Sequence, residues 1–415
     1  MNVLVFNAGS SSLKFKLIRM PEEREVLHGI AERVGETRGR ARVFCAGPAG
    51  RVQQRTRACS GHSEALILAL EAIDQAFQAA TGGPAAIDLL GHRVVHGRDI
   101  FTGPTRVDDQ AMEHLVSIQE LAPLHLPPAL DVLRACRQRM PALPQVACFD
   151  TTFYGSMPAK SYRYAVPREW YTRHGVRRFG FHGLSHQYVT RAAADLLGIP
   201  IGELKLISAH LGNGASITAF SRGRPVDTSM GFTPLEGLIM GTRAGYLDPA
   251  VLPYLQRRTG LDLAQLVDLL NNESGLKAVS GCSRDLRNIM AARAGGDPDA
   301  ALAVEMYVHT LRKYIGAYHF ALSGARALVF TGGIGENARE VRRLVLEGWE
   351  ALGLALDPAA NDQMVDGRCG LISAPHSQVK VLVIPTDEER MIARQAYELV
   401  AGPGEGADAP GRSGD

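Results

Sequence analysis

This chain of 415 residues contains no apolar stretch near the roughly 20 residues that a membrane-spanning helix requires. Its charge is almost balanced, because 45 Lys and Arg stand against 43 Asp and Glu and leave a formal net charge of only +2. A strongly basic chain would suggest nucleic acid or an anionic membrane surface as a partner, and this chain gives no such reason. We therefore expect neither nucleic acid nor a membrane among its partners.

Cysteine is sparse and follows no recognisable pattern. The six cysteines are scattered and form no Cys-x-x-Cys pair, so reduced, idle thiols are the simplest interpretation. The N-terminus has no basic segment followed by a signal-like apolar core, and residues 2–6 are short enough to be a strand. We expect a reduced, cytoplasmic protein with inert thiols.

Glycine, by contrast, is abundant and punctuates three loops that each follow an apolar, strand-like run. The loops read Asn-Ala-Gly-Ser-Ser-Ser-Leu-Lys at 7–14, His-Leu-Gly-Asn-Gly-Ala at 210–215 and Thr-Gly-Gly-Ile-Gly-Glu-Asn at 331–337. Glycine lets a backbone turn tightly and bring its N–H groups against an anion, so such loops suit phosphate binding. Three of them, spread over most of the chain, indicate a nucleotide held between two lobes.

The first two loops lie in similar predicted hairpins. Residues 3–6 form a buried-strand run, and residues 13–17 alternate apolar and Lys side chains as in a half-buried strand. Residues 204–209 and 216–220 repeat this pattern around the second loop. The repeat, about half a chain away, suggests an internally duplicated architecture.

Strands and helices alternate along the rest of the chain, which predicts an α/β fold. Residues 403–415 lack large apolar side chains and are predicted to be a disordered tail. Apolar spacing and buried runs predict helices at 63–80, 301–322 and 388–400 and strands at 89–95, 146–149, 327–330 and 379–384.

Five further motifs accompany the loops. They are Gly-His-Arg-Val-Val-His-Gly at 91–97, Phe-Asp-Thr-Thr-Phe at 149–153, Phe-Gly-Phe-His-Gly at 179–183, Met-Gly-Thr-Arg at 240–243 and Pro-Thr-Asp-Glu-Glu at 385–389. With the three loops, and in this order, they make the chain closely resemble the acetate kinase family. The resemblance runs from residue 2 to about residue 399, and several multi-residue motifs at family-like spacings make coincidence very improbable.

The resemblance implies a duplicated actin-like (ribonuclease H-like) ATPase fold of two α/β lobes with an active-site cleft between them. The N-terminal lobe would comprise 1–150 and 385–402, and the C-terminal lobe 151–384. The implied reaction is reversible phosphoryl transfer, in which acetate and ATP give acetyl phosphate and ADP. It would require Mg²⁺, with Mn²⁺ as the alternative, and family members are usually homodimers.

The residue types suit this chemistry. A carboxylate acceptor is already a nucleophile, so the site must mainly hold the acceptor and the γ-phosphoryl group in line and screen their repulsion. Arginine offers a fixed charge and a planar fork that matches both groups. Family analogy assigns Arg93 and Arg243 to this task. It assigns His182 to the transferring phosphoryl group and Asp150 to positioning the acceptor or a metal-linked water.

The resemblance assigns the remaining site positions residue by residue. Asn7 and Glu388 match the magnesium-associated positions. An apolar pocket for the methyl group of the acceptor would be formed by Val95, Leu124, Phe181 and Pro234. Because such a pocket discriminates one methylene by only about 1–3 kcal/mol, propionate is the second candidate substrate. ATP would be bound by Lys14, His210, Leu211, Gly212, Asn213, Gly214, Asp285, Leu286, Arg287, Gly333, Ile334, Gly335, Glu336 and Asn337.

Two interpretations from other classes compete with this one. Residues 333–338 satisfy Gly-x-Gly-x-x-Ala after a strand, with Asp357 about 20 residues later, which is typical of a dinucleotide-binding dehydrogenase. That interpretation leaves the other two loops and both arginine motifs without a role. The actin-like fold also serves non-catalytic nucleotide-switched modules, but the presence of Arg93, Asp150, His182 and Arg243 together favours catalysis.

Six positions depart from the family pattern. They flank the acceptor and nucleotide pockets, so the motifs leave the choice of acid and of nucleotide open. The departures are Leu126 for the usual Asn, Tyr154 for His, Leu184 for Thr, Ala244 for Ser, Tyr246 for Asp, and an unusual Arg284.

Overall fold

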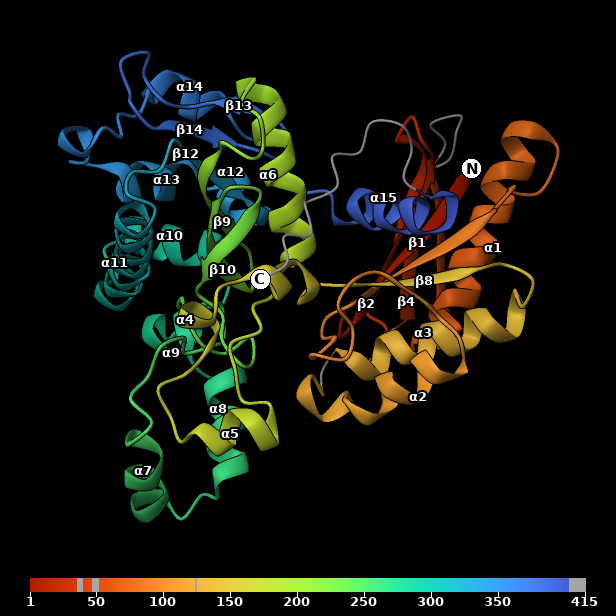
Figure 1. Cartoon of the computed structure of the whole chain (residues 1–415), viewed down its shortest axis with the longest axis horizontal. Helices are drawn as coiled ribbons and strands as arrows, with labels where there is room; N and C mark the ends of the chain where they lie inside the picture. Colours follow the sequence, from red (N-terminus) through yellow and green to blue (C-terminus); the bar gives the residue numbers. More distant parts are fainter. Residues whose placement is uncertain (36–39, 47–51, 124, 403–415) are drawn as a thin grey trace, which may run out of the picture. The chain divides into compact units, whose positions relative to one another are not determined.

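The computed structural model describes residues 1–35, 40–46, 52–123 and 125–402. The chain divides into two compact units: unit 1 is Met1–Gly155 together with the chain from Asp387, and unit 2 is Ser156–Thr386. Figure 1 labels the helices and strands of each. The predicted tail at 403–415 and the predicted pocket residue Leu124 lie outside the described residues. Every described helix is too short or too polar to cross a bilayer.

Unit 1 is built on a mixed sheet, which in the described part of the chain has the order β5-β4-β3-β2-β1-β6-β8-β7. Strands β1 to β5 pair antiparallel in succession, β6 and β8 run parallel to β1, and β7 is antiparallel to β8. The strands are β1 (Asn2–Ala8), β2 (Ser12–Arg19), β3 (Arg24–Glu32), β4 (Arg40–Ala46), β5 (Val52–Ala58), β6 (Leu89–Val94), β7 (Thr105–Arg106) and β8 (Gln145–Phe149).

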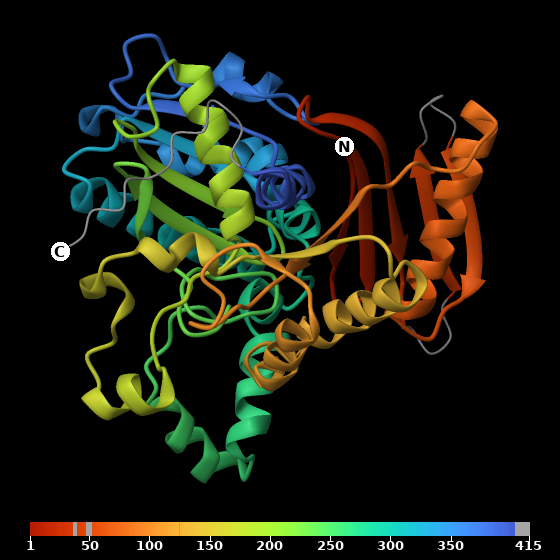
Figure 2. The ribbon, with the colours of Figure 1, turned by 45° about the vertical axis from the view of Figure 1, so that its right-hand side comes forward.

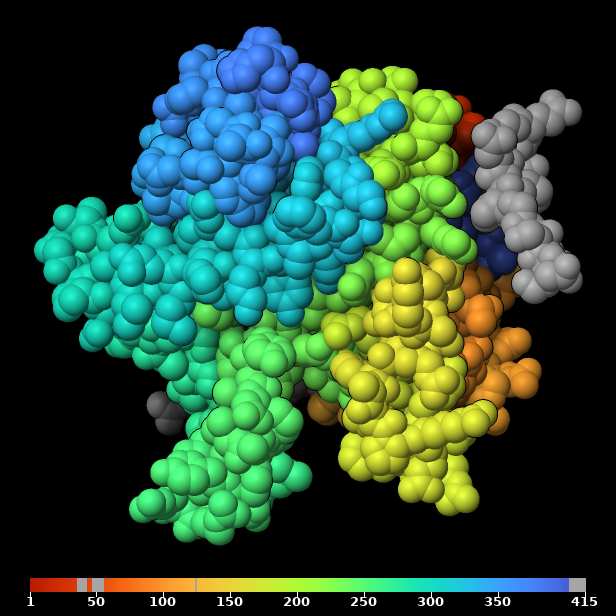
Figure 3. All heavy atoms as spheres, turned by 60° about the vertical axis from the view of Figure 1, so that its left-hand side comes forward, coloured from red at the N-terminus to blue at the C-terminus, as the bar shows by residue number. Residues whose placement is uncertain are grey.

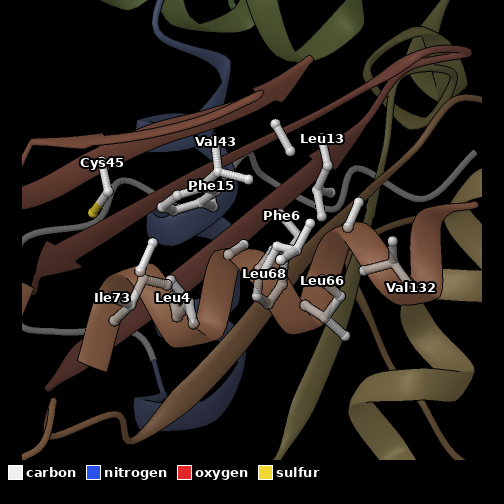
Figure 4. Packing of buried hydrophobic residues seen from close by; sticks show 14 of the residues in the cluster. Leu4, Phe6, Leu13, Phe15, Val43, Cys45, Leu66, Leu68, Ile73 and Val132 are labelled. Atoms are coloured by element: carbon white, nitrogen blue, oxygen red, sulfur yellow. The ribbon is translucent and has the colours of Figure 1, made fainter. Parts of the chain in front are cut away.

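Helices cover both faces of this sheet. Because strand side chains alternate between faces, Leu4 and Phe6 of β1 pack toward α1 (His62–Thr81) and α3 (Leu126–Arg139), as Figure 4 shows. Figure 2 shows the ribbon of these helices beside the sheet. The opposite face packs on α15 (Glu388–Ala401), which contacts β1, β6 and β8. A Cβ on Gly91 would lie 2.8 Å from Cγ2 of Ile392, so glycine there lets α15 pack closely. Helix α2 (Asp109–Ser117) and 3₁₀ helices at Gln119–Leu121 and Thr152–Ser156 complete the unit.

Unit 2 has its own mixed sheet, with the order β11-β10-β9-β12-β14-β13 among the described residues. Strands β9, β10 and β11 pair antiparallel, β12 and β14 run parallel to β9, and β13 is antiparallel to β14. The strands are β9 (Lys205–Leu211), β10 (Ala215–Ser221), β11 (Arg224–Thr228), β12 (Ala327–Thr331), β13 (Gly370–Leu371) and β14 (Lys380–Val383).

The helices of unit 2 include a long one, α11, and a projecting pair, α7 and α8, which Figure 3 shows extending away from the rest of the unit. A 3₁₀ helix lies at Glu350–Leu352. The helices are α4 (Ala159–Tyr162), α5 (Arg168–His174), α6 (Gly183–Leu197), α7 (Val251–Thr259), α8 (Leu263–Asn272), α9 (Gly275–Ser280), α10 (Leu286–Ala294), α11 (Pro298–Ala321), α12 (Gly332–Asn337), α13 (Arg339–Leu346) and α14 (Pro358–Gln363).

The two sheets repeat one topology. The order β3-β2-β1-β6-β8-β7 in unit 1 corresponds, strand for strand and in relative direction, to β11-β10-β9-β12-β14-β13 in unit 2. Unit 1 extends the pattern by β4 and β5. The α/β fold class and the duplication predicted from the two similar hairpins are confirmed.

The predicted elements agree with the structure, with one correction. The hairpins at 2–19 and 205–221 form as expected, and the helix predicted at 63–80 ends where Gly82 takes φ +74°. The third glycine-rich segment, predicted to be a loop, is instead the short helix α12, which begins directly after β12. Gly332, with φ +75°, makes this abrupt change of direction possible.

Candidate functional site

Arg93 and Asp150 form a buried ion pair at neighbouring strand ends of unit 1. Arg93 lies near the end of β6, and Asp150 directly follows β8, which pairs with β6. Nε and Nη2 of Arg93 donate to Oδ1 and Oδ2 of Asp150 at 3.2 and 2.7 Å. Asp150 is 0% exposed. This bidentate geometry gives the pair both strength and a fixed orientation.

Asn7 joins this ion pair to the start of α15. Its Oδ1 accepts from Nη1 of Arg93 at 3.2 Å, while its Nδ2 donates to Glu388 Oε2 at 3.0 Å and Glu389 Oε1 at 2.9 Å. Nε of Arg93 lies 3.6 Å from Glu388 Oε2. We call Asn7, Arg93, Asp150, Glu388 and Glu389 the acidic cluster.

The acidic cluster has a surplus of negative charge. One guanidinium faces three carboxylates, a net charge of −2. Burial alone would lower the pKa of Arg93, but the carboxylates of Asp150 and Glu388 raise it above its ordinary value. Oxygen donors and negative charge suit a hard divalent cation such as Mg²⁺. No three His, Cys, Asp or Glu side chains among the described residues form a ready-made metal site, as is usual where substrate phosphates supply part of the coordination.

Two other predicted ligand-binding residues belong to unit 1. Lys14 pairs with Asn7 across the first hairpin and is exposed. Among the described residues no carboxylate forms an ion pair with Lys14, whereas Lys16 is engaged by Asp387 at 2.9 Å. Val95 follows β6 and is buried.

In unit 2, His182, His210 and Arg243 gather around the turn between β9 and β10. His182 immediately precedes α6 in the left-handed conformation, with φ +57°, and its ring stacks on that of His210 at 4.3 Å between centroids. A Cβ on Gly214 would lie 3.3 Å from Nε2 of His182 and 3.5 Å from Nη1 of Arg243. These two side chains therefore flank the backbone of Gly214.

Arg243 is a partly buried cation that, within the described part of the chain, has no carboxylate partner. Its Nη1 donates to the carbonyl oxygen of Pro234 at 3.4 Å and lies 3.8 Å from the sulfur of Met240. Burial lowers the pKa of Arg243, the direction expected for a desolvated cation without a nearby negative charge. The arrangement favours an anion at this point.

Two glycines let other backbone segments approach the turn at 212–214. The N–H of Gly241 donates to the carbonyl oxygen of Asn213 at 3.2 Å, and a Cβ on Gly241 would meet Oδ1 of Asn213. A Cβ on Gly332 would lie 2.7 Å from the carbonyl oxygen of Leu211. The turn therefore touches both the segment that carries Arg243 and the start of α12.

A cavity of about 1000 Å³ opens beside this turn within unit 2. Its size is at the upper end of the range for ligand pockets, which suits a nucleotide. The residues predicted to bind ATP that line it are Gly212, Asn213, Asp285, Leu286, Arg287, Gly333, Ile334 and Asn337. The cavity is also lined by residues that were not predicted to bind ATP, which are Arg284, Met290, Ala338, Arg339, Glu340, Val341 and Asp366.

The charged side chains on the cavity wall differ in whether they form ion pairs within the protein. Asp285 caps α10 and also accepts from Nη2 of Arg287 at 2.6 Å, and this hydrogen bond lowers the pKa of Asp285. Arg284 is exposed and has no ion-pair partner in the described ranges. Arg284 is thus the more available of these two arginines for a bound anion.

The other residues assigned to ATP do not line this cavity. Leu211 is a buried strand end, and Nδ1 of His210 lies 2.8 Å from the hydroxyl of Ser185. Gly335 and Glu336 direct their carbonyl oxygens at the buried Arg342. Lys14 belongs to unit 1. The structure therefore brings together part of the predicted nucleotide site.

The residues predicted to surround the acceptor's methyl group fall in both units. Phe181 is fully buried next to His182, and Pro234 contacts Arg243 through its carbonyl oxygen. Both belong to unit 2, whereas Val95 belongs to unit 1.

Beyond the cavity wall, two more residues near the site were not predicted from the sequence. Asn7 donates a hydrogen bond to Glu389 that is as short as its hydrogen bond to Glu388. In the sequence, the position of Glu389 next to Glu388 in the motif is the feature that could have indicated its role. Arg342 is one of three arginines at 339–343, and no local pattern marks it as the buried one.

Most departures from the family pattern are accommodated within the fold. Leu126, Tyr154 and Leu184 are buried apolar or aromatic side chains. Ala244 donates its N–H to the carbonyl oxygen of Leu270 at 3.0 Å, and Tyr246 is exposed. Arg284 differs from these because it lines the cavity.

The dehydrogenase interpretation receives no support from its acidic residue. Asp357 is the N-cap of α14, and its carboxylate accepts from the N–H groups of Ala359 and Ala360 at 3.0 and 3.1 Å. The carboxylate therefore serves a helix end.

Known proteins resemble this chain along nearly its whole length. Acetate kinase from Oceanobacillus iheyensis is 44% identical over 403 residues, 96% of this chain and 98% of that protein. Acetate kinase from Caldanaerobacter subterraneus subsp. tengcongensis is 45% identical over 411 residues, covering 97% and 100%. The structure of Porphyromonas gingivalis acetate kinase matches with a TM-score of 0.87 and 39% identity over 96% of this chain and 99% of that one.

A propionate kinase from Francisella tularensis subsp. tularensis matches with the same TM-score, 0.87, at 36% identity over 96% of this chain and 100% of that one. These likenesses confirm the duplicated actin-like ATPase fold. The model of the acetokinase family matches residues 2–394. This chain belongs to the acetokinase family.

Proposed function

We propose that this protein catalyses reversible transfer of the γ-phosphoryl group of ATP to the carboxylate of acetate, giving acetyl phosphate and ADP. The single observation that carries the proposal is the setting of Arg243. A desolvated guanidinium without a carboxylate partner in the described residues lies beside His182 and a glycine turn, and the same turn borders a cavity of nucleotide size. Family membership supports the same reaction.

In unit 2, we assign binding of ATP and stabilisation of the moving phosphoryl group. The cavity would hold the nucleoside, and the backbone at 212–214 would approach its phosphates. Arg243 and His182 would stabilise the charge that spreads over the equatorial oxygens in the transition state. His210 would support His182 through ring stacking.

In unit 1, we assign the acceptor and the metal. Arg93 would orient the carboxylate of acetate, and Val95 would contact its methyl group. Because Asp150 already binds Arg93 in a bidentate pair, its first task would be to fix that guanidinium. Lys14 would contact phosphate.

The acidic cluster fits Mg²⁺, with Mn²⁺ as the alternative. Its donors are all oxygens and its net charge is negative, which is what hard cations require. Asn7, Glu388 and Glu389 would hold the ion, which supplies charge neutralisation of the ATP phosphates. Glu388→Gln and Glu389→Gln should each raise the Mg²⁺ concentration needed for half-maximal rate. An unchanged Mg²⁺ dependence in both variants would remove the cluster from metal binding.

Propionate is the second candidate acceptor. A solved propionate kinase is as similar in fold as a solved acetate kinase, and an apolar pocket separates the two acids by only about 1–3 kcal/mol. Among the chain's relatives, acetate kinases are the better represented. We therefore place acetate first.

A hydroxylamine trap for acyl phosphate tests the function. The assay would contain ATP, Mg²⁺ and one carboxylic acid of the C1–C4 series at a time. We expect hydroxamate with acetate at the highest kcat/KM, with propionate next. Binding of ATP without transfer to any acid would instead support a nucleotide-switched module, and NAD-linked oxidation of a hydroxy acid would support a dehydrogenase.

We further propose a homodimer in the cytoplasm, where ATP is available. Exposed apolar side chains on α7 and α8 of unit 2, among them Tyr254, Leu263 and Leu269, are suitable for burial against a second copy. Sedimentation equilibrium would show twice the chain mass of 44.7 kDa if the proposal holds. A monomer at micromolar concentration would contradict it.

A further inference from the structure

Three imidazole rings and three serine hydroxyls gather in unit 2, linked by hydrogen bonds and by the stacking of His182 on His210. His186, in the first turn of α6, has Nδ1 against the hydroxyl of Ser208 on β9 and Nε2 2.7 Å from the hydroxyl of Ser216 on β10. The same Ser216 hydroxyl lies 2.9 Å from Nδ1 of His182. Ser216 therefore bridges the buried His186 to the site residue His182.

The buried members of this cluster are shielded from water. His186 and Ser216 are 0% exposed and Ser208 is 1% exposed. The pKa of His186 lies well below its ordinary value, mainly because the ring is buried and secondly because His210 is close. His186 is therefore a neutral imidazole, with one nitrogen that donates a hydrogen and one that accepts.

The hydroxyl of Ser216 has a single hydrogen and lies between two ring nitrogens, so two orderings place that hydrogen in a bond between the rings. In the first, Nε2–H of His186 donates to Ser216, and Ser216 donates to Nδ1 of His182, which leaves the hydrogen of His182 on Nε2. In the second, every bond is reversed and Nε2 of His182 presents a lone pair. Nε2 is the atom beside Gly214 and near Arg243, where an anion is expected.

We propose that Ser216 and His186 are positioning residues that hold His182 as the Nε2–H tautomer, so that Nε2 donates a hydrogen bond to the transferring phosphoryl group. This inference rests on the function proposed above. An anion repels a lone pair and attracts a donor, so its binding selects the first ordering. Ser208 is compatible with that ordering because its hydroxyl can donate to Nδ1 of His186.

The stacking of His182 on His210 adds a second restraint. Nδ1 of His210 is 2.8 Å from the hydroxyl of Ser185, which in turn accepts from Thr386 at 2.7 Å. The ring of His182 is thus held by stacking on one side and by the Ser216 hydrogen bond at its edge. Removing the hydroxyl of Ser216 would leave the stacking of His182 on His210 intact. The ring of His182 could then carry its hydrogen on either nitrogen.

A double-mutant cycle with Ser216→Ala and His182→Ala tests the inference. Ser216→Ala should lower kcat for acetyl phosphate formation by about 100-fold, the loss typical of one transition-state donor, with little change in KM for ATP or acetate. Because Ser216 acts through His182, the double variant should be no slower than His182→Ala alone. Thr218→Val is the matched control, since it removes a buried hydroxyl two residues along the same strand face and should keep the wild-type rate.

A spectroscopic measurement on the wild-type protein tests the tautomer directly. In ¹⁵N-histidine-labelled protein with ADP, Mg²⁺ and inorganic phosphate, we expect His182 to show a protonated Nε2 and an unprotonated Nδ1. The opposite tautomer, additive effects in the cycle, or a Ser216→Ala variant with wild-type kcat would overturn the inference. If the wild type formed no acetyl phosphate, that result would count against the proposed function. The inference about His182 would still be decided separately, by the tautomer that the NMR measurement shows.

Discussion

Arg93 and Arg243 are both partly buried, yet they differ in what surrounds them. Arg93 is bound to the fully buried carboxylate of Asp150. Burial alone would lower the pKa of Arg93, but the nearby carboxylates raise it above its ordinary value. Arg243 meets a carbonyl oxygen and a sulfur atom, and burial lowers its pKa. The guanidinium of Arg93 already has a carboxylate partner within the fold, whereas that of Arg243 has none among the described residues.

This contrast predicts opposite effects on stability. Arg93→Leu leaves the Asp150 carboxylate buried without its partner, so we expect the free energy of unfolding to fall by about 3–5 kcal/mol. Arg243→Leu removes a desolvated cation that has no carboxylate partner in the described residues, and stability should stay the same or rise. Urea titration measures both. Equal destabilisation by the two substitutions would contradict the assignment, and Arg93→Leu with Asp150→Leu should recover part of the loss.

His92 predicts a pH dependence of stability. It is buried against the ring of Phe6, and burial lowers its pKa from 6.5 to about 4. Between these values the unfolded chain binds the proton and the folded chain does not, so stability rises with pH. The contribution, about 3 kcal/mol, is present above pH 6.5 and is lost as pH falls toward 4.

Urea unfolding across this pH range would measure the effect. His92→Phe keeps an aromatic ring against Phe6 and removes the titrating group, so the variant should show a shallower decline of stability with acid. A variant whose decline matches the wild type would show that other groups cause it.

At the scale of elements, α9 holds the segment that carries Arg243. Gly275 begins this helix with φ +64°, and a Cβ there would lie 2.2 Å from the carbonyl oxygen of Met240 and 2.6 Å from that of Arg243. The N–H of Leu276 donates to the same Met240 oxygen at 2.9 Å. The start of α9 is thus packed on the backbone of the Met240–Arg243 turn.

Gly275→Ala should therefore lower kcat in addition to the stability that it loses through backbone strain, because the new Cβ would displace the segment that carries Arg243. Gly281→Ala is the matched control, because Gly281 also has φ +64° but open space at its Cβ position. Both should lose about 1–2 kcal/mol of stability from the left-handed conformation. Only Gly275→Ala should also lower kcat, by about 10- to 100-fold, through displacement of Arg243. Equal kcat values in the two variants would refute this role of α9.

Helix α12 is held at its C-terminal end by the fully buried Arg342. Nη1 of Arg342 donates to the carbonyl oxygens of Gly335 and Glu336, both at 2.8 Å, and Nη2 donates to those of Asn361 and Met364. Burial lowers the pKa of Arg342 to about 10. One side chain thus fixes the short helix that borders the cavity to α14 and to the residue that follows α14.

Arg342→Met should strip these carbonyl oxygens of their donors. An unsatisfied buried polar group costs about 1–3 kcal/mol, so we expect a loss of about 3–5 kcal/mol and a raised KM for ATP with a smaller change in kcat. Arg343→Met is the control, because that side chain is an exposed partner of Glu340 and Glu347 and should lose less than about 1 kcal/mol. Similar urea midpoints for the two variants would contradict the prediction.

In the molecule as a whole, the duplication could be predicted because each half of the chain contains the same local sequence pattern. The two hairpins share a period-2 alternation and a glycine turn, and the structure extends their likeness to six corresponding strands. Strands β3 to β5 were not predicted. Their segment gives no buried run as clear as residues 3–6, and their place depends on successive pairing of β3 with β2, β4 with β3 and β5 with β4.

The candidate site was predictable where contiguous motifs carry it, as at Arg93, His182 and Arg243. It was not predictable where one residue acts from a distance. Arg342 and Ser216 have ordinary sequence surroundings, and only the packing of helices on strands reveals their partners. The third glycine segment was misjudged because its glycines suit a loop and a helix start equally well.

We propose above all that the guanidinium of Arg243, which has no carboxylate partner among the described residues, stabilises a phosphoryl group as it moves between ATP and acetate. The most direct measurement is kcat for acetyl phosphate formation, followed by ³¹P NMR at saturating ATP, acetate and Mg²⁺, in the wild type and in Arg243→Leu. We predict acetyl phosphate from the wild type and a loss of about 100- to 1,000-fold in the variant at unchanged urea stability. A folded Arg243→Leu protein with a near wild-type kcat would contradict the account.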